Sequence, residues 1–352
     1  MQKKEKIIIV LCVIATIAAG VLHYAGANAV LSFAVTAVAL ALLALIVGDA
    51  TEQLGSRLGP AATGILQSGL GNLPELFVSI FALRARLANV VQAALVGSIL
   101  GNSLLVFGLA IFLGGLKNGT QRFKSETPKM IATLMLLAVS ALIIPTLANE
   151  THTPAAFHID QLDIALAIIL LALLAASVLF SVKGDRAISP NPNDGDQHAE
   201  WSLGLTIGVL AGAGIGAGLV SDWFVEALQP AMKALNLSEA FAGLVVVAIA
   251  GNAIENLVGV QLAWRNQSDY AVSVILNSSL QVALGLFPVL VLLSLALGGA
   301  VLTFALSPLL VVSLALAALV SAFVVYDGES IWLEGLALIG LYCIIAASFW
   351  WG

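Results

Sequence analysis

The sequence predicts an all-α membrane protein that crosses the bilayer about eleven times. Of its 352 residues, 60% are hydrophobic and 10% are charged, whereas soluble domains carry roughly 25% charged residues. The apolar residues form long runs rich in Leu, Ala and Ile, with short polar gaps between them. Strands of a membrane barrel are alternating segments of about ten residues, so these runs indicate helices.

Eleven runs have about the length that a helix needs to cross the hydrocarbon core. The expected spans are residues 7–23, 28–48, 60–84, 90–115, 129–147, 162–182, 202–224, 239–263, 270–297, 301–325 and 331–350. The first run follows Lys3, Lys4 and Lys6, as a signal peptide would. A second span follows it at once, so we interpret it as a leading transmembrane helix.

The basic residues predict the orientation. With the N-terminus inside, eleven of the 14 Lys and Arg residues fall in cytoplasmic loops. The three outside are Arg84, Arg86 and Lys233. Because cytoplasmic loops carry an excess of Lys and Arg, we expect a multi-pass protein of the cell (plasma) membrane with a cytoplasmic N-terminus and an external C-terminus.

An internal repeat divides the chain. Residues 71–75 (Gly-Asn-Leu-Pro-Glu) recur as residues 251–255 (Gly-Asn-Ala-Ile-Glu), at an offset of 180 residues, and Ser98 meets Ser278 at the same offset. The two copies lie in the third and eighth spans, so an odd number of crossings separates them and they run in opposite directions. This is the pattern of inverted-repeat transporters, whose site lies at the midplane between interrupted helices.

The repeat defines four expected parts of the chain. These are a leading helix (1–27), a first five-helix repeat (28–182), a cytoplasmic linker (183–201) and a second five-helix repeat (202–352). The linker is rich in Pro, Gly, Asn and Asp, a composition typical of flexible segments.

Glu75 and Glu255 are expected deep within their spans, where a charged group costs from about 2.5 to over 10 kcal/mol. Asp163, Asp222 and Glu334 also fall inside the runs, but near helix ends where their carboxylates can reach the headgroups. No Lys or Arg lies deep in a span to neutralise the two glutamates. The pair therefore indicates a functional site; the alternative is a structural hydrogen-bonded pair.

Polar residues at helical spacing surround the two glutamates. Side chains three or four positions apart share a helix face. Four such pairs occur: Asn72 with Glu75, Asn252 with Glu255, Ser98 with Asn102, and Ser278 with Gln281. All-oxygen ligation of this kind suits hard cations such as Ca²⁺ and disfavours copper, zinc and iron. For any single Ser or Asn, helix packing is an equally good interpretation.

Helix breaks are expected to add backbone ligands. Pro74 has no N–H, so the carbonyl of Leu70 loses its helical partner and can face the site. Gly71 lies in this break, and in the second copy Gly251 weakens the helix. The alternative is a kink that serves packing alone.

Electrostatics predicts exchange. Two carboxylates close together in a low-dielectric cavity cannot both stay ionised without compensation. Either a divalent cation or protons must neutralise them, so an empty, doubly charged site is costly to carry across the membrane. We expect Glu75 and Glu255 to bind the cation in one state and to carry protons in the other, with alternating access around them.

At this point the motifs identify a family. Residues 50–52 (Ala-Thr-Glu), 59–60 (Gly-Pro), 71–76, 97–102 (Gly-Ser-Ile-Leu-Gly-Asn) with 104–108, 114–115 (Gly-Gly), 251–255 and 278–281 resemble the calcium/cation antiporter superfamily, and most of all its calcium/proton exchanger branch. The resemblance implies one leading helix plus two inverted five-helix repeats, Glu75 and Glu255 as central ligands, and export of Ca²⁺ from the cytoplasm against entering H⁺.

Some positions depart from the branch. It usually has Ala at Leu73, a small or flexible residue at Pro74, and His at Asn256. Asn cannot titrate, so a proton relay through that position is not expected. The sodium-coupled branch tends to have an acidic residue at the position of Gln281. Because Gln281 is neutral, the resemblance favours H⁺ over Na⁺ as the coupled ion.

The closest alternative is a different ion on the same scaffold: Na⁺/Ca²⁺ exchange or monovalent cation/H⁺ exchange. An enzyme is disfavoured. An intramembrane aspartyl protease would need two catalytic aspartates in the bundle core, but Asp222 and Asp327 lie near span ends. A membrane prenyltransferase would need Asp-rich motifs that bind diphosphate, and these are absent. We expect a secondary transporter in the lipid bilayer with Ca²⁺ and H⁺ as substrates, no cofactor and no nucleic-acid partner. The sequence leaves the oligomeric state open.

Overall fold

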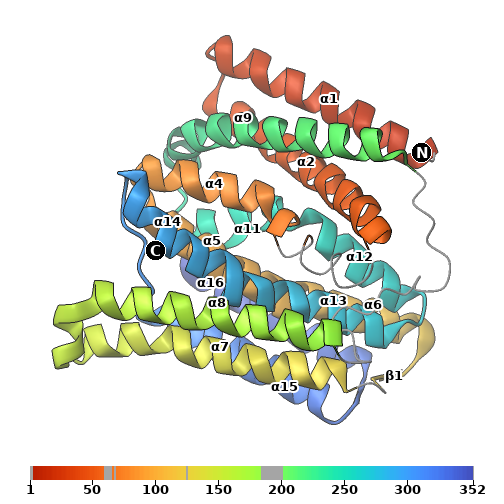
Figure 1. Ribbon diagram of the computed structural model, residues 1–352, viewed down its shortest axis with the longest axis vertical. Coiled ribbons are helices and arrows are strands. Elements are labelled where there is room, and N and C mark those ends of the chain that lie inside the picture. Colours follow the sequence, from red (N-terminus) through yellow and green to blue (C-terminus); the bar gives the residue numbers. More distant parts are fainter. Residues whose placement is uncertain (1–2, 59–65, 67–68, 124–125, 184–200, 352) are drawn as a thin grey trace.

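The computed structural model describes residues 3–58, 66, 69–123, 126–183 and 201–351; of residues 253–257 it describes the backbone only. The side chains of residues 3, 4, 58 and 181–183 likewise lie outside the described part. The structure is a bundle of helices (Figure 1). The expected linker, residues 183–201, falls almost wholly on 184–200, which lie outside the described residues.

The leading helix and the first repeat occupy the chain up to residue 183. The elements are α1 (Lys3–Tyr24), α2 (Ala29–Leu58), α4 (Leu73–Arg84), α5 (Ala88–Leu100), the π-helix η1 (Gly101–Val106), α6 (Phe107–Asn118), the short strand β1 (Gln121–Arg122), α7 (Thr127–Glu150), the 3₁₀ turn η2 (Pro154–His158) and α8 (Ile159–Lys183).

The second repeat follows the linker. Its elements are α9 (Leu203–Leu235), α10 (Glu239–Phe241), the π-helix η3 (Ala242–Val247), α11 (Ala248–Gly251), α12 (Ala253–Trp264), α13 (Ser268–Gln281), the π-helix η4 (Val282–Leu286), α14 (Phe287–Leu297), α15 (Pro308–Tyr326), the strand β2 (Glu329–Ser330) and α16 (Trp332–Trp350). Strands β1 and β2 pair antiparallel and so join loops of the two repeats.

Nine helices among the described residues are long and apolar enough to cross a membrane. The two other expected spans, 60–84 and 239–263, contain the shorter helices α4 and α10 to α12. The expected all-α polytopic fold, with one leading helix and two inverted five-helix repeats, is therefore confirmed.

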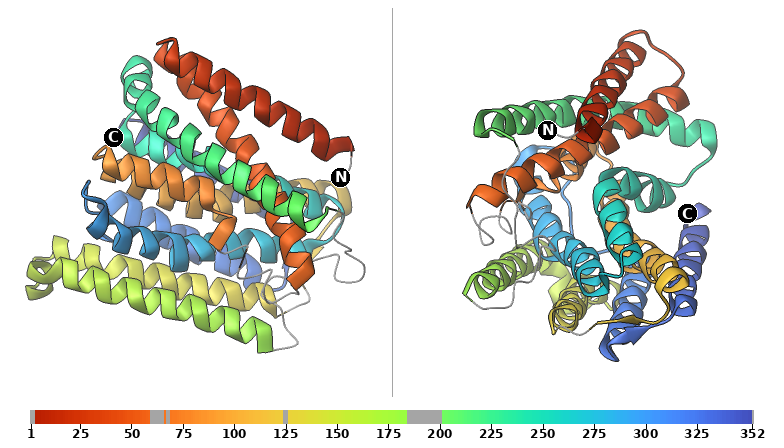
Figure 2. Two further views of the ribbon diagram at one scale, coloured as in Figure 1. Left: turned by 45° about the horizontal axis from the view of Figure 1, so that its top comes forward. Right: turned by 90° about the vertical axis from the view of Figure 1, so that its right-hand side faces the viewer.

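The interrupted helices lie inside the bundle and the continuous apolar ones around them. Helices α1, α2 and α9 form one side, and α7, α8 and α15 the opposite side, with α4, α5, α12 and α13 between (Figures 1 and 2). The two chain ends lie at opposite ends of the bundle (Figure 1), as an odd number of crossings requires. Large apolar side chains on α1, such as Ile14 and Ile17, are more than half exposed and so form a surface suited to lipid.

Three expected span boundaries are wrong. Helix α2 continues to Leu58, past the expected end at residue 48, and α9 continues to Leu235, past the expected end at residue 224. The apolar run marks only the part of a helix that fits the hydrocarbon core, and the helix can continue beyond it. The tenth span was expected from residue 301, but α15 begins at Pro308. Residues 301–307 are apolar yet not helical, so hydropathy alone placed them in the helix.

Side chains of the first repeat hold this non-helical segment. The backbone N–H of Phe304 donates to Asp163 Oδ2 at 3.1 Å, that of Leu306 to Thr146 Oγ1 at 2.8 Å, and that of Ala300 to the Leu83 carbonyl at 2.9 Å. Irregular backbone that is buried needs such partners. The expectation that Asp163 reaches the headgroups is therefore wrong: its side chain is buried, and it accepts a backbone hydrogen bond instead.

Candidate functional site

Both repeats break a helix at the same place with nearly the same backbone. Asn72 has φ −94° and ψ 17°, and Asn252 has φ −105° and ψ 20°. A new helix, α4 or α12, begins at the next residue in each case. Glu75 and Glu255 are consequently the third residues of their helices, where the positive end of the helix dipole favours a carboxylate.

The two breaks share a Gly-Asn pair but differ in the residues around it. Pro74 lies in the first turn of α4, where a missing N–H removes no helical hydrogen bond of that helix. In the second repeat, α11 ends at Gly251 after the π-helix η3. Leu70 directly precedes the first break, and Gly71 lies in it, in a turn with Asn72. A ligand role for the Leu70 carbonyl stays a prediction.

The next helices along the chain, α5 in the first repeat and α13 in the second, cross each other at the centre of the molecule. They continue into the π-helices η1 and η4, which occupy matching positions in the two repeats. At the crossing, Asn102 Nδ2 donates to Ser278 Oγ at 2.9 Å, and the hydroxyls of Ser103 and Ser279 lie 3.0 Å apart. Ser279 Oγ also lies 3.4 Å from the Ile99 carbonyl, its counterpart 180 residues away. A contact between repeat-equivalent residues places the pseudo-twofold axis close to this point.

Two glycines allow α5 and η3 to touch through their backbones. A Cβ added at Gly97 would lie 2.2 Å from the Leu244 carbonyl oxygen, and one at Gly243 would lie 2.4 Å from the Val90 carbonyl oxygen. No other residue fits such an approach, and small residues serve this purpose in membrane bundles. The contact brings the second-repeat break against the first-repeat helix that carries Ser98.

Glu75 is joined to the second repeat by a chain of hydrogen bonds. Its side chain is 2% exposed, and its Oε1 accepts from Ser98 Oγ. Ser98 Oγ in turn accepts from Asn252 Nδ2 at 2.8 Å, and Asn252 Nδ2 also donates to the Ala248 carbonyl at 2.9 Å. A Cβ added at Gly251 would lie 3.5 Å from the Cβ of Glu75. The first-repeat carboxylate therefore packs directly against the second-repeat break.

The structure brings most of the predicted residues together. Seven of the predicted polar side chains are buried: Asn72, Glu75, Ser98, Asn102, Asn252, Ser278 and Gln281. Glu75, Ser98 and Asn252 form one hydrogen-bonded group, and Asn102 with Ser278 forms another. These two groups do not include the side chains of Asn72 or Gln281. The side chain of Glu255 lies outside the described residues, and its backbone lies in α12.

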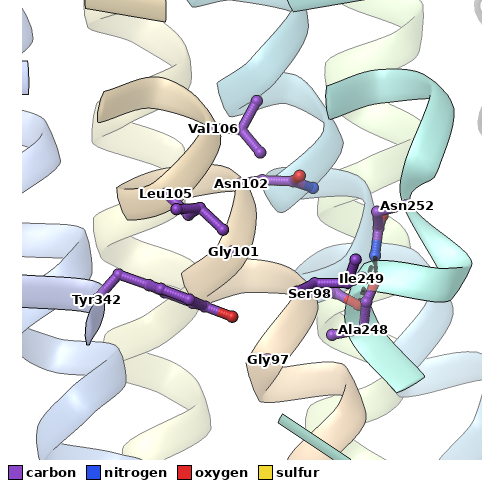
Figure 3. Close-up of a pocket in the computed structure, with 10 residues that line it drawn as sticks. All are labelled: Gly97, Ser98, Gly101, Asn102, Leu105, Val106, Ala248, Ile249, Asn252 and Tyr342. Atoms are coloured by element: carbon purple, nitrogen blue, oxygen red, sulfur yellow. Dashed lines mark hydrogen bonds between the residues drawn. The ribbon is translucent and has the colours of Figure 1, made fainter. Parts of the chain in front are cut away.

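The structure also shows residues that the sequence did not single out. Ser103 joins the central crossing, and Tyr342 of α16 lines a cavity with Ser98, Asn102 and Asn252 (Figure 3). A single Tyr in an apolar span is typical of a residue that anchors a helix at the membrane interface. The sequence therefore could not predict that Tyr342 lines this cavity. Ser103 follows Asn102, and its polarity in an apolar run was the available signal.

The oxygen-rich centre defines the class of protein. Carboxylate, hydroxyl and amide groups meet in the middle of an inverted-repeat bundle, between interrupted helices of opposite direction. This is the architecture of a secondary transporter for small hydrophilic solutes or ions. A family model described as sodium/calcium exchanger protein matches residues 28–183 and 205–351. The chain belongs to this sodium/calcium exchanger family, whose members are ion antiporters and not enzymes.

Curated relatives are similar over nearly their whole length. A "Ca(2+)/H(+) antiporter" of Synechocystis sp. is 34% identical over 99% of this chain and 98% of its own length. The "Ca(2+)/H(+) antiporter ChaA" of Bacillus subtilis is 35% identical over 90% of this chain and 91% of its own. A "Vacuolar cation/proton exchanger 3" of Oryza sativa subsp. japonica is 32% identical over 94% of this chain and 82% of its own.

Solved structures share the fold. The structure described as native YfkE matches with a TM-score of 0.84 at 30% identity, over 98% of this chain and 99% of that one. A structure described as the H⁺/Ca²⁺ exchanger CAX matches with a TM-score of 0.77 at 16% identity, over 99% of this chain and 92% of that one. At 16% identity, the second match bears on the fold alone.

Proposed function

We propose that the protein is an antiporter that exchanges cytoplasmic Ca²⁺ for external H⁺. One observation carries the proposal: the carboxylate of Glu75 is buried at the interface of the two repeats, hydrogen-bonded through Ser98 to Asn252 of the opposite repeat. A carboxylate at this depth is costly unless it has a function. The names of the similar proteins of Synechocystis and Bacillus subtilis support Ca²⁺ and H⁺ as the exchanged ions.

The cation would be held by oxygen atoms from both repeats. Ca²⁺ takes six to eight oxygen ligands, from carboxylates, amides, carbonyls and water. The proposed side-chain ligands are Glu75, Asn72, Ser98 and Asn102 of the first repeat and Glu255, Asn252, Ser278 and Gln281 of the second. Ca²⁺ is cargo in this scheme, and no resident cofactor is needed.

The repeat suggests how Glu255 takes part. Glu75 and Ser98 are 23 residues apart and hydrogen-bonded, and Glu255 and Ser278 have the same spacing in the second repeat. We therefore place Glu255 on the opposite side of the same cation, as the second carboxylate. Asn102 of η1 donates a hydrogen bond to Ser278. It would therefore link the pair of Glu255 and Ser278 to the first repeat.

Coupling follows from the need to neutralise the two carboxylates. Ca²⁺ cancels both charges when it binds, and two protons do the same when it leaves. The bundle can then change its accessible side in either loaded state, whereas the empty charged state is held back by the cost of burying unpaired charge. Exchange is therefore obligatory in this scheme.

The proposed location is the cell (plasma) membrane, with the N-terminus in the cytoplasm. The excess of Lys and Arg in the loops on that side supports this orientation. Labelling of single cysteines placed in the loops on intact cells tests it, and the buried Cys12 and exposed Cys343 are replaced beforehand.

The decisive experiment is Ca²⁺ flux in liposomes that contain the purified protein. An imposed pH gradient should drive ⁴⁵Ca²⁺ uptake, and collapse of the gradient with a protonophore should stop it. Mg²⁺, Mn²⁺, Na⁺ and K⁺ are tested as competitors beside it. Uptake that follows a Na⁺ gradient and ignores the pH gradient would refute proton coupling in favour of the sodium-coupled alternative.

A further inference from the structure

A small cavity lies beside the Glu75 group, against the last helix. Ser98 and Asn102 line one wall, Asn252 another, and Tyr342 of α16 closes it (Figure 3). In Figure 3 the ring of Tyr342 extends from α16 with its hydroxyl towards the α5 segment at Gly97 and Ser98. The cavity has room for about one water molecule.

Two polar atoms of the lining residues have no hydrogen-bond partner among the described residues. They are the Tyr342 hydroxyl and the Asn252 Oδ1 atom, and their residues are 4% exposed each. Leaving such a group unsatisfied is unfavourable, and nearly all buried polar groups in proteins have a protein or water partner. Both residues line the same water-sized space, and one water that bridges them would satisfy both atoms.

The donors and acceptors fit this explanation. The Tyr342 hydroxyl can donate to a water, and Asn252 Oδ1 can only accept from one. The Asn252 amide nitrogen is already committed to Ser98 and Ala248. A water that accepts from Tyr342 and donates to Asn252 would thus complete the hydrogen bonds of the Asn252 amide and fix which way it faces.

We propose that Tyr342 is a positioning residue of the transport site, which acts through a water in this cavity. The water holds the Asn252 amide in the orientation that directs its nitrogen to Ser98, and Ser98 then directs its hydroxyl to Glu75. Tyr342 thereby links α16, the last helix, to the ligand geometry of both repeats. This inference rests on the proposed function of the Glu75 site.

Tyr342→Phe tests the proposal, because it removes the hydroxyl and keeps the ring. In proteoliposomes we expect the KM for Ca²⁺ to rise about three- to tenfold, with the maximal rate within about twofold of wild type, since the change removes one hydrogen bond from the network that positions a ligand. Tyr326→Phe on α15 is the matched control, since Tyr326 is 76% exposed, and it should leave both constants unchanged.

A crystal structure of the wild-type protein at a resolution that shows ordered water supplies the second readout. We expect a water within hydrogen-bond distance of the Tyr342 hydroxyl and the Asn252 amide, and no water there in Tyr342→Phe. A wild-type cavity without water, or an unchanged KM in Tyr342→Phe, overturns the proposal. Failure of the proposed function looks different, because wild-type protein would then show no pH-driven Ca²⁺ uptake at all.

Discussion

The two helix breaks differ in sequence and agree in geometry. The first contains Pro74, and the second has Ile254 at the equivalent position and a π-helix a few residues earlier. Asn72 and Asn252 nevertheless adopt almost the same φ and ψ, and each new helix begins at the following residue. The shared elements are the Gly-Asn pair at the break and the Glu at the third helical position.

This comparison shows which residues the break needs and which it tolerates. A helix can be ended by a proline, by a glycine or by a change in hydrogen-bonding register. The glutamate at the start of the next helix cannot be replaced in the same way, because the site needs a negative charge at that position. The predictions below test this distinction.

The largest effect is expected from the glutamates. Glu75→Gln and Glu255→Gln should each reduce pH-driven Ca²⁺ uptake to background, because either change removes a charge that balances the cation and a group that carries a proton. Size-exclusion profiles should stay those of the folded protein, since Gln keeps the shape. Normal transport by one of the two would show that the repeats are not functionally equivalent.

Gly97→Ala should come next, through stability. The added methyl would lie 2.2 Å from the Leu244 carbonyl oxygen, and overpacking of this kind costs about 1–3 kcal/mol or more. We expect a lower melting temperature in detergent and reduced transport. Gly212→Ala on α9 is the control, since nothing lies within 4 Å of its added Cβ. Equal melting temperatures of the two variants would contradict a close backbone contact between α5 and η3.

Ser98→Ala should weaken cation binding while the fold persists. It removes the hydroxyl that donates to Glu75 and accepts from Asn252, a loss of about 1–2 kcal/mol, or roughly five- to thirtyfold in affinity. Isothermal titration with Ca²⁺ measures it. Ser103→Ala alters the neighbouring Ser103–Ser279 contact and should change the affinity less. A larger loss of Ca²⁺ affinity in Ser103→Ala than in Ser98→Ala would indicate that the cation binds at the crossing of α5 and α13 and not at the Glu75 group.

The smallest effect is expected from Pro74→Ala. Proline lies in the first turn of α4, where it is favourable without being required, and the second repeat makes the same break with Ile254. Transport rates should stay within about twofold of wild type. A large loss in flux assays would show that Pro74 has a role beyond starting the helix.

Much of the fold could be predicted because lipid imposes simple rules. Long apolar runs must be helices in a bilayer, and the repeated Gly-Asn-x-x-Glu motif predicted the interrupted helices. Hydropathy failed at residues 301–307, because a non-helical segment is tolerated where Thr146 and Asp163 accept two of its N–H groups. Those partners are distant in sequence, so no local pattern indicates them.

The candidate site was predictable to a similar degree. Helical spacing grouped residues within one repeat, and it placed Ser98 and Asn102 on one face. It could not show that Ser98 pairs with Glu75 and with Asn252, since these contacts depend on how α5 packs against the second repeat. The place of Tyr342 depends on α16, which lies far along the chain from the other lining residues.

The most direct measurement of the central claim is a crystal structure of the protein with Ca²⁺ bound. We predict one Ca²⁺ at the centre of the bundle, with an oxygen of Glu75 and an oxygen of Glu255 each about 2.3–2.6 Å from it. A Ca²⁺ held by only one of the two carboxylates, or bound away from both helix breaks, would contradict the claim that the two repeats share a single cation.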